Sequence, residues 1–119
     1  MRNNYDVIVI GAGPAGMMAA ITAASKKFSV LVIEQKKQAG SKILVTGKGR
    51  CNITNDSDVP DVMKNVMTNP SFLYSALYAF PPSKIIEYFN SIGVETVTER
   101  GRRVFPKSNK AIDVRDALV

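Results

Sequence analysis

The sequence predicts an α/β fold that opens with a strand, a helix and a second strand parallel to the first. Two apolar runs rich in β-branched residues, 5–10 (YDVIVI) and 29–33 (SVLVI), have the composition of strands buried on both faces of a sheet. Between them, a glycine-rich turn leads into alanine, methionine and isoleucine, a composition that favours a helix ending near Lys26 and Lys27. The 119 residues correspond to about one small domain.

The turn between the first strand and the helix has the sequence GAGPAG, residues 11–16. Gly11 permits a tight turn, Gly13 lets a pyrophosphate approach the backbone, and Gly16 lets the helix pack closely on the strand. Pro14 and Ala15 fall in the first helical turn, where a proline needs no amide donor and the helix amino terminus faces an anion.

Glu34 closes the second strand, where a carboxylate can accept hydrogen bonds from ribose hydroxyls and would repel a 2′-phosphate. Strand, glycines, small-residue helix, second strand and acid occur in the order of a dinucleotide-binding fingerprint. This order predicts an incomplete Rossmann-like domain. The alternative is a glycine-rich turn in an unrelated α/β domain, with Glu34 as a solvated strand end.

A second motif, TGKGRCNITN at residues 46–55, surrounds the single cysteine with turn-forming and basic residues. The chain has no histidine and no second cysteine, so this loop cannot form a metal site of soft ligands or an intramolecular disulfide. Cys51 is expected to be a small packing residue. A reactive thiol, with its pKa lowered by Arg50, is the alternative.

These residues bring a resemblance into view. DVIVIGAGPAGMMAAI followed by IEQ resembles the FAD-binding start of glutathione-reductase-like flavoproteins. The segment 40–55, GSKILVTGKGRCNITN, resembles the signature of a bacterial family of aminoacetone-oxidase-like, NAD(P)/FAD-dependent oxidoreductases. Segments 93–106 and 108–118 agree with that family, so the resemblance covers nearly the whole chain. Ser41 and Lys48 depart from its pattern, and a single cysteine excludes the mechanism of the disulfide reductases.

The resemblance suggests a role for the second motif. Gly40, Gly47 and Gly49 allow positive φ and close backbone approach, so that the loop can present amides to the cofactor. Lys42 and Arg50 would supply positive charge to the pyrophosphate or to the reduced flavin. Thr46 and Asn52 complete the expected cofactor contacts, and the side chains of Asn52, Thr54 and Asn55 are expected to hold the loop through local bonds to the backbone. Without the resemblance, the same loop is a solvated basic turn.

The resemblance implies FAD as the cofactor of a flavin-dependent oxidoreductase that catalyses amine oxidation or reduction of a conjugated carbonyl compound. NAD(P)H is a candidate electron donor, and no catalytic acid or base is assigned. Because the resembled class completes its FAD domain with downstream segments, residues 1–119 are expected to be a truncated amino-terminal part, inactive alone. A self-sufficient small domain is the alternative.

The remaining sequence predicts a helix over residues 72–80 with its aromatics in the core, and a second helix opened by Pro81 and Pro82 and ended by Gly93. Residues 94–98 and 102–105 predict a β-hairpin. Ser108 is expected to cap a last helix that carries an apolar stripe of Ala111, Val114 and Leu118.

A formal net charge of +6 favours an anionic partner. An NAD-binding dehydrogenase domain meets the same ribose and pyrophosphate requirements as an FAD domain. A basic nucleic-acid-binding module is the rival from another class, but the aromatics of residues 72–80 lie in an uncharged run. We therefore expect a small-molecule substrate, no nucleic acid and no membrane partner. A single cysteine and a glycine-interrupted apolar start favour the cytoplasm.

Overall fold

The computed structural model describes residues 3–119, and its first part is the expected strand–helix–strand unit. Strand β1 (Val7–Ile10) pairs in parallel with β2 (Val30–Ile33), with Val7 opposite Val30 and Ile10 opposite Ile33. Helix α1 (Pro14–Ser25) connects them and has Pro14 as its first residue. The pairing continues one residue further, because Gly11 N donates to Ile33 O at 2.7 Å. The predicted α/β fold class is confirmed.

The second part is a three-stranded antiparallel sheet in the order β3–β5–β4. Strands β4 (Thr96–Glu99) and β5 (Arg103–Pro106) form the predicted hairpin around η3 (Arg100–Arg102), a short 3₁₀ turn. The sequence did not predict β3 (Thr54–Asn55), which pairs with β5. The second motif, residues 46–55, is called the cysteine loop below. Its end is therefore part of the hairpin sheet.

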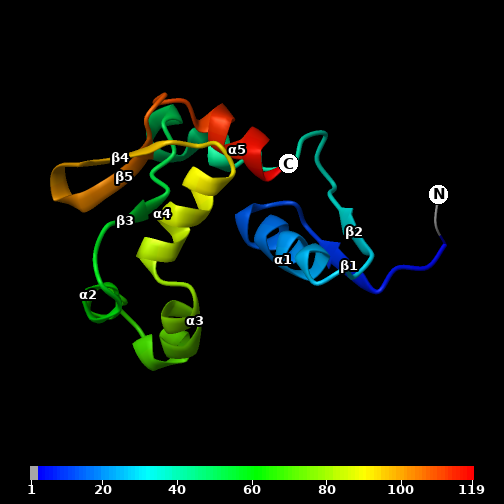
Figure 1. Ribbon diagram of the computed structural model, residues 1–119, viewed down its shortest axis with the longest axis horizontal. Helices are drawn as coiled ribbons and strands as arrows, with labels where there is room; N and C mark the ends of the chain where they lie inside the picture. Colours follow the sequence, from blue (N-terminus) through cyan, green and yellow to red (C-terminus); the bar gives the residue numbers. More distant parts are fainter. Residues whose placement is uncertain (1–2) are drawn as a thin grey trace.

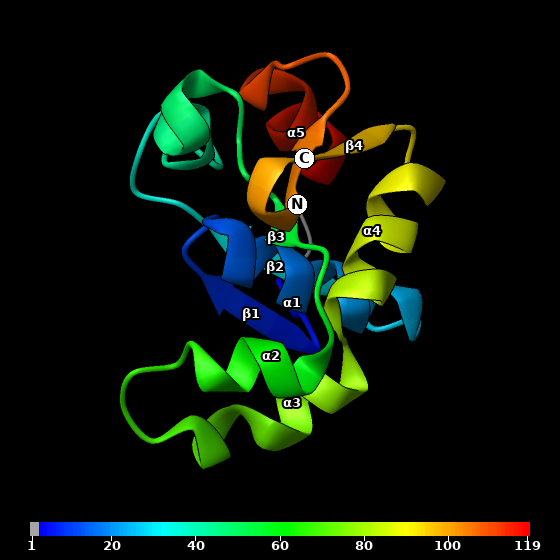
Figure 2. The same cartoon turned by 90° about the vertical axis from the view of Figure 1, so that its left-hand side faces the viewer.

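Short helices connect and separate these two sheets. Figure 1 shows α4 and α5 between the strand–helix–strand unit and the hairpin sheet, and Figures 1 and 2 show α2 and α3 lying apart from both sheets. The bounds are η1 (Ile43–Gly49), α2 (Val59–Lys64), η2 (Pro70–Leu73), α3 (Tyr74–Ala79), α4 (Pro82–Ser91) and α5 (Ala111–Leu118). Within residues 3–119, no helix has the length and apolar character that a membrane crossing requires.

One buried cluster joins the two parts of the chain. It combines residues from the glycine turn, α1, the cysteine loop, α4 and α5. The predicted stripe on the last helix, Ala111, Val114 and Leu118, is buried in it, which confirms that prediction. Gly93 follows α4 with φ +90°, as expected for a glycine that ends a helix. The buried members are Ala12, Met17, Ile43, Cys51, Phe89, Val94, Ala111, Val114 and Leu118.

The prediction that the two parallel strands are buried on both faces is wrong for the described residues. Ile8 is 56% exposed and Ile10 86% exposed, and Ile33 on β2 is 48% exposed. Within the unit α1 packs on both strands, and α5 contacts α1, whereas no described element buries these isoleucines. An all-apolar strand indicates that both of its faces favour burial. It does not indicate which segment packs against them.

Two further expectations fail in the middle and at the end of the chain. The aromatics of residues 72–80 are exposed, because η2 and α3 break the expected helix into two short pieces that leave Phe72 81% and Tyr74 53% exposed. Ser108 does not cap α5, whose N-cap is Lys110. The Ser108 hydroxyl instead accepts a bond from Lys110 N at 3.3 Å, which forms a turn before the helix.

Candidate functional site

The glycine turn has one position where the fold itself requires glycine on steric grounds. A Cβ on Gly16 would lie 1.9 Å from the carbonyl oxygen of Gly11, far inside contact distance. Gly11 has φ +97°, a conformation that L side chains rarely adopt. These two glycines let α1 begin directly against the end of β1, as the sequence predicted.

Gly13 is different, because neither its backbone nor its neighbours require glycine. Its φ is −78°, which is accessible to any residue, and a Cβ there would meet nothing within 4 Å. The open space lies at the start of α1, where Pro14 and Ala15 begin the helix and the first-turn N–H groups have no partner inside the helix. Such a helix terminus favours an anion. No packing contact among residues 3–119 therefore accounts for glycine at position 13.

Glu34 binds the glycine turn through one carboxylate oxygen and the segment after β2 through the other. Ala12 N donates to Oε2 at 2.8 Å and Lys36 N donates to Oε1 at 2.9 Å. The N–H groups of Lys36 and Ala12 favour the charged form and lower the pKa of Glu34 below its ordinary value. Each carboxylate oxygen can still accept a second hydrogen bond. The predicted ribose contact is compatible with this geometry and is a proposal below.

The cysteine loop forms two short 3₁₀ turns separated by a kink at residues 46–48. The φ angles of Gly40, Gly47 and Gly49 are +65°, +55° and +84°, which confirms the predicted positive φ at all three. A Cβ on Gly47 would lie 2.7 Å from Asn52 N and 3.3 Å from Phe105 Cε1, whereas a Cβ on Gly49 would meet nothing within 4 Å. Gly47 is thus a packing position, and Gly49 is open to its surroundings.

Hydrogen bonds within the loop close its tight bend. Cys51 N donates to Thr46 O at 3.0 Å, and the Thr46 hydroxyl donates to Ile43 O at 2.7 Å. Cys51 is buried, and burial raises the pKa of its thiol, opposed by a weaker hydrogen bond from Thr46. The prediction that Cys51 is a packing residue is confirmed by its place in the core cluster.

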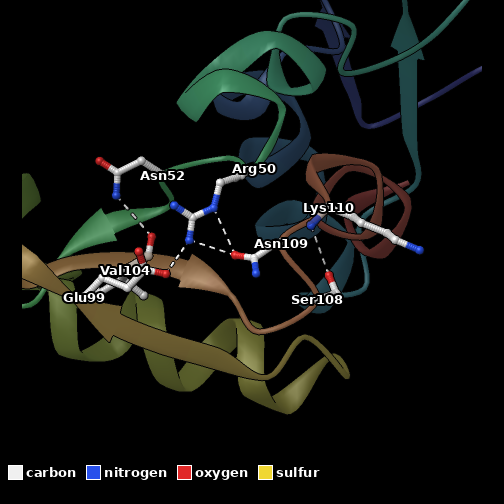
Figure 3. Close-up of polar contacts among 7 residues, drawn as sticks. All are labelled: Arg50, Asn52, Glu99, Val104, Ser108, Asn109 and Lys110. Carbon is white, nitrogen blue, oxygen red and sulfur yellow. Dashed lines mark hydrogen bonds and ion pairs between the residues drawn. The ribbon is translucent and has the colours of Figure 1, made fainter.

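The Arg50 side chain is partly exposed and binds groups far along the chain (Figure 3). Its Nε and Nη2 donate to Asn109 Oδ1 at 2.9 and 2.7 Å, and Nη2 also pairs with Glu99 Oε2. The guanidinium carbon lies 4.0 Å from the centre of the Phe105 ring. The sequence predicted a cofactor contact for Arg50, and none of these three partners was predicted. No local spacing pattern connects residues this far apart.

Asn52 and Asn55 attach the other end of the loop to the hairpin sheet. Asn52 Nδ2 donates to Thr54 O at 3.0 Å. It also donates to Val104 O at 3.1 Å (Figure 3). The first bond is local, as expected. Asn55 does not make the expected local bond, because its Nδ2 donates to Gly101 O in the hairpin turn at 2.9 Å. Both side chains therefore stabilise the contact between the loop and the hairpin.

The two lysines of this region are the cations with free side chains. Lys42 and Lys48 are exposed, and neither forms an ion pair among residues 3–119. Lys48 has φ +55°, within the kink of the loop. The positive charge available to an anion in this part of the chain comes from these lysines more than from Arg50.

The glycine turn and the cysteine loop border the same core cluster, to which Ala12 and Cys51 both belong. Gly40 N donates to Ala12 O at 2.7 Å, which ties the start of the loop segment to the turn. A Cβ on Gly40 would lie 2.7 Å from Arg115 Cγ on α5, so this contact also requires a small residue. The predicted site residues thus form two groups, one in the glycine turn and one in the cysteine loop. The hydrogen bond from Gly40 N to Ala12 O connects the segments that carry them.

Two hollows on the surface border the glycine turn and the last helix. The space between the end of α4, the hairpin and α5 is about 620 Å³ and is lined by charged residues that include Glu95, Lys107 and Asp113. An apolar hollow of about 290 Å³ borders the turn at Ala12 and Met17. Neither hollow contains Gly13 or the residues of the loop.

Comparison with known proteins agrees with this geometry. The family model described as the HI0933-like protein Rossmann domain matches residues 5–119. The chain belongs to this family, a group of FAD-binding oxidoreductases with a Rossmann-type domain. The family assignment agrees with the predicted class, whereas the narrower aminoacetone-oxidase-like name is not among its descriptions.

Curated relatives extend well beyond the length of this chain. The 3-dehydro-bile acid delta(4,6)-reductase of Clostridium scindens is 38% identical over 92% of the chain and 27% of its own length. The ribosomal RNA dihydrouridine synthase of Escherichia coli is 40% identical over 76% of the chain and 22% of its own. A digeranylgeranylglycerophospholipid reductase of Methanosarcina mazei is 54% identical over 36% of the chain and 11% of its own. The chain therefore spans about a quarter of the first two relatives.

The second of these relatives bears on the expectation of no nucleic-acid partner. Its name describes a protein that acts on ribosomal RNA. This is a conflict with that expectation at the level of the family, although the exposed aromatics of residues 72–80 still lie in an uncharged run.

Proposed function

We propose that residues 1–119 bind the ADP part of FAD and form the amino-terminal segment of a flavin-dependent oxidoreductase. The observation that carries the proposal is Gly13, a glycine that neither φ nor packing requires, beside open space at the start of a helix. The pyrophosphate would lie along this turn, with Gly11, Ala15 and Gly16 shaping its backbone. Glu34, already oriented by two backbone donors, would accept a bond from the ribose.

The cysteine loop would present its open backbone at Gly49 to the same cofactor. Exposed Lys42 and Lys48 would provide positive charge near the pyrophosphate or the reduced ring. A flavin in this site would supply hydride transfer at its ring N5. The residues described here bind and orient such a group, and none of them is assigned as an acid or base.

Reduction of a carbon–carbon double bond is the reaction that the relatives favour. Two of the three relatives above are named as reductases, and the third is named for making dihydrouridine. We propose a conjugated carbonyl compound or a related unsaturated ring as substrate, with NAD(P)H as electron donor. Amine oxidation, the reaction suggested by the aminoacetone-oxidase-like resemblance, is the alternative. Anaerobic bleaching of the flavin by NADPH, without bleaching by aminoacetone, would support the reductase.

The cofactor proposal is tested with the full-length protein and a Gly13→Val variant. The valine side chain would fill the space beside the turn, so flavin absorbance after desalting should be lost while the thermal midpoint stays near that of the flavin-free parent protein. Ala19→Val is the matched control, since Ala19 is exposed further along α1. Retention of flavin by Gly13→Val, or tighter binding of NADH than of FAD by the parent protein, would contradict the proposal.

A further inference from the structure

We infer that Arg50 is a positioning residue that fastens the loop of residues 46–52 to the hairpin, and that it makes no contact with the cofactor. Glu99, Phe105 and Asn109 are its partners, and together these four side chains form what we call the loop clasp. The inference deepens the proposed function, on which it rests where cofactor binding is concerned. It assigns a role in the cofactor site to residues that no comparison singles out.

The Nε and Nη2 atoms of the Arg50 guanidinium already have partners within the chain. Two of its nitrogens bind Asn109 Oδ1 at 2.9 and 2.7 Å, and one of them also pairs with the Glu99 carboxylate. Because Glu99 neutralises the positive charge, an anion near Arg50 meets a nearly neutral pair. A cofactor contact through Nε or Nη2 would require these bonds to break first.

The Phe105 ring lies against the loop next to Arg50. Phe105 is buried, and its ring centre lies 4.0 Å from the guanidinium carbon, while its Cε1 atom would lie 3.3 Å from a Cβ on Gly47. The ring therefore contacts the loop at both Gly47 and Arg50. Its place on β5 makes the rigid hairpin sheet the support for the loop.

Two neighbouring residues, Cys51 and Asn52, form further bonds that hold the loop. Asn52 Nδ2 binds Val104 O on β5, and Cys51 N closes the bend on Thr46 O. Arg50 and Asn52 therefore attach the loop to the hairpin on both sides of Cys51. If the clasp opens, Cys51 is the residue that becomes exposed, because it is buried under this bend.

Cys51 supplies a direct measurement of the clasp that does not depend on flavin. In the full-length, flavin-free protein, the alkylation rate of Cys51 by iodoacetamide would be followed by peptide mass spectrometry. Arg50→Ala and Glu99→Ala should each raise this rate about tenfold or more, since local opening controls access to a buried thiol. The matched control is Arg100→Ala, an exposed arginine in the adjacent hairpin turn with no ion pair among residues 3–119. It should leave the rate unchanged.

Flavin affinity then distinguishes a positioning role from a charge contact. Each single variant should weaken FAD binding about fivefold, and the double variant no more than the stronger single one, because both act through one unit. Arg50→Lys should behave like Arg50→Ala, since lysine keeps the charge and loses the planar fork and the ring contact. The thermal midpoint should change by only about 3 °C in each variant.

Several results would overturn the inference. One is weaker FAD binding in Arg50→Ala with unchanged alkylation of Cys51, and another is full recovery of binding by Arg50→Lys. Unchanged FAD affinity in Glu99→Ala would do the same. If Arg50→Ala does not fold, Asn109→Ala and Glu99→Ala carry the test. If the parent protein binds no flavin, the proposed function fails, whereas the alkylation rates still decide whether the clasp exists.

Discussion

The glycine turn and the cysteine loop both expose backbone at tight bends, but different forces hold them. The turn depends on close contact between neighbours in the chain, with Gly16 placed directly over the Gly11 carbonyl. The loop depends on residues 49 and 59 positions further along, through the bonds from Arg50 to Glu99 and Asn109. The comparison teaches that one half of a binding site can be encoded locally while the other half requires a distant sheet.

The energies differ in kind as well. A Cβ on Gly16 would overlap the carbonyl oxygen of Gly11, and such steric repulsion is not weakened by solvent. The Arg50–Glu99 pair is partly open, with side chains 34% and 40% exposed, so that alone it contributes only about 0–1 kcal/mol. The Phe105 ring adds about 0.5–1 kcal/mol at an exposed site. The loop is therefore held by several weak contacts, and the turn by one strong requirement.

The largest expected effect tests the local half. Gly16→Val would force the side chain against Gly11 O and should lower the free energy of unfolding by at least about 3 kcal/mol. Urea denaturation of the full-length protein would measure it. The control Ala19→Val, exposed on the same helix, should cost less than about 1 kcal/mol. Equal stabilities of the two variants would show that the turn is not the rigid element described here.

A second, smaller effect compares two glycines within the loop. Gly47→Ala should cost about 2 kcal/mol, because it combines positive φ with a 2.7 Å approach to Asn52 N. Gly49→Ala also has positive φ but meets open space, and should cost about 1 kcal/mol. Thermal denaturation of both variants measures the difference. A larger loss for Gly49→Ala would mean that the loop does not rest on the hairpin as described.

The smallest effect concerns Glu34, which joins the end of β2 to the turn. Because its pKa is lower in the folded chain, its contribution is present above the ordinary glutamate pKa and is lost as the pH falls through the folded value. Glu34→Gln should therefore be less stable than the parent near about pH 7 and nearly equal to it near about pH 3. Denaturation midpoints at both values measure this.

Glu87→Gln is the control for Glu34, since Glu87 is exposed on α4 and makes no side-chain hydrogen bond among residues 3–119. The pH-dependent loss in Glu34→Gln is measured against this control at the same two pH values. If Glu34→Gln differs in stability from the parent by the same amount at both pH values, the charge of the carboxylate does not stabilise the turn.

Much of the fold could be predicted from the sequence where the pattern is local. The strand–turn–helix–strand order, the hairpin over residues 94–105 and the buried stripe of the last helix follow from periodicity and turn chemistry. The exposed aromatics of residues 72–80 could not be predicted, because composition indicates a preference for burial and not the presence of a covering element.

The sequence by itself determined the glycine turn, since Gly11 acts through its φ angle and Gly16 through a contact within a few residues. It also determined that the loop bends at Gly47 and Gly49. Only the tertiary structure decided where Arg50 points, which glycine is crowded and which is open, and that Cys51 is buried. The physical reason is that these properties depend on atoms brought close by β5 and the turn before α5, whose positions no local spacing specifies.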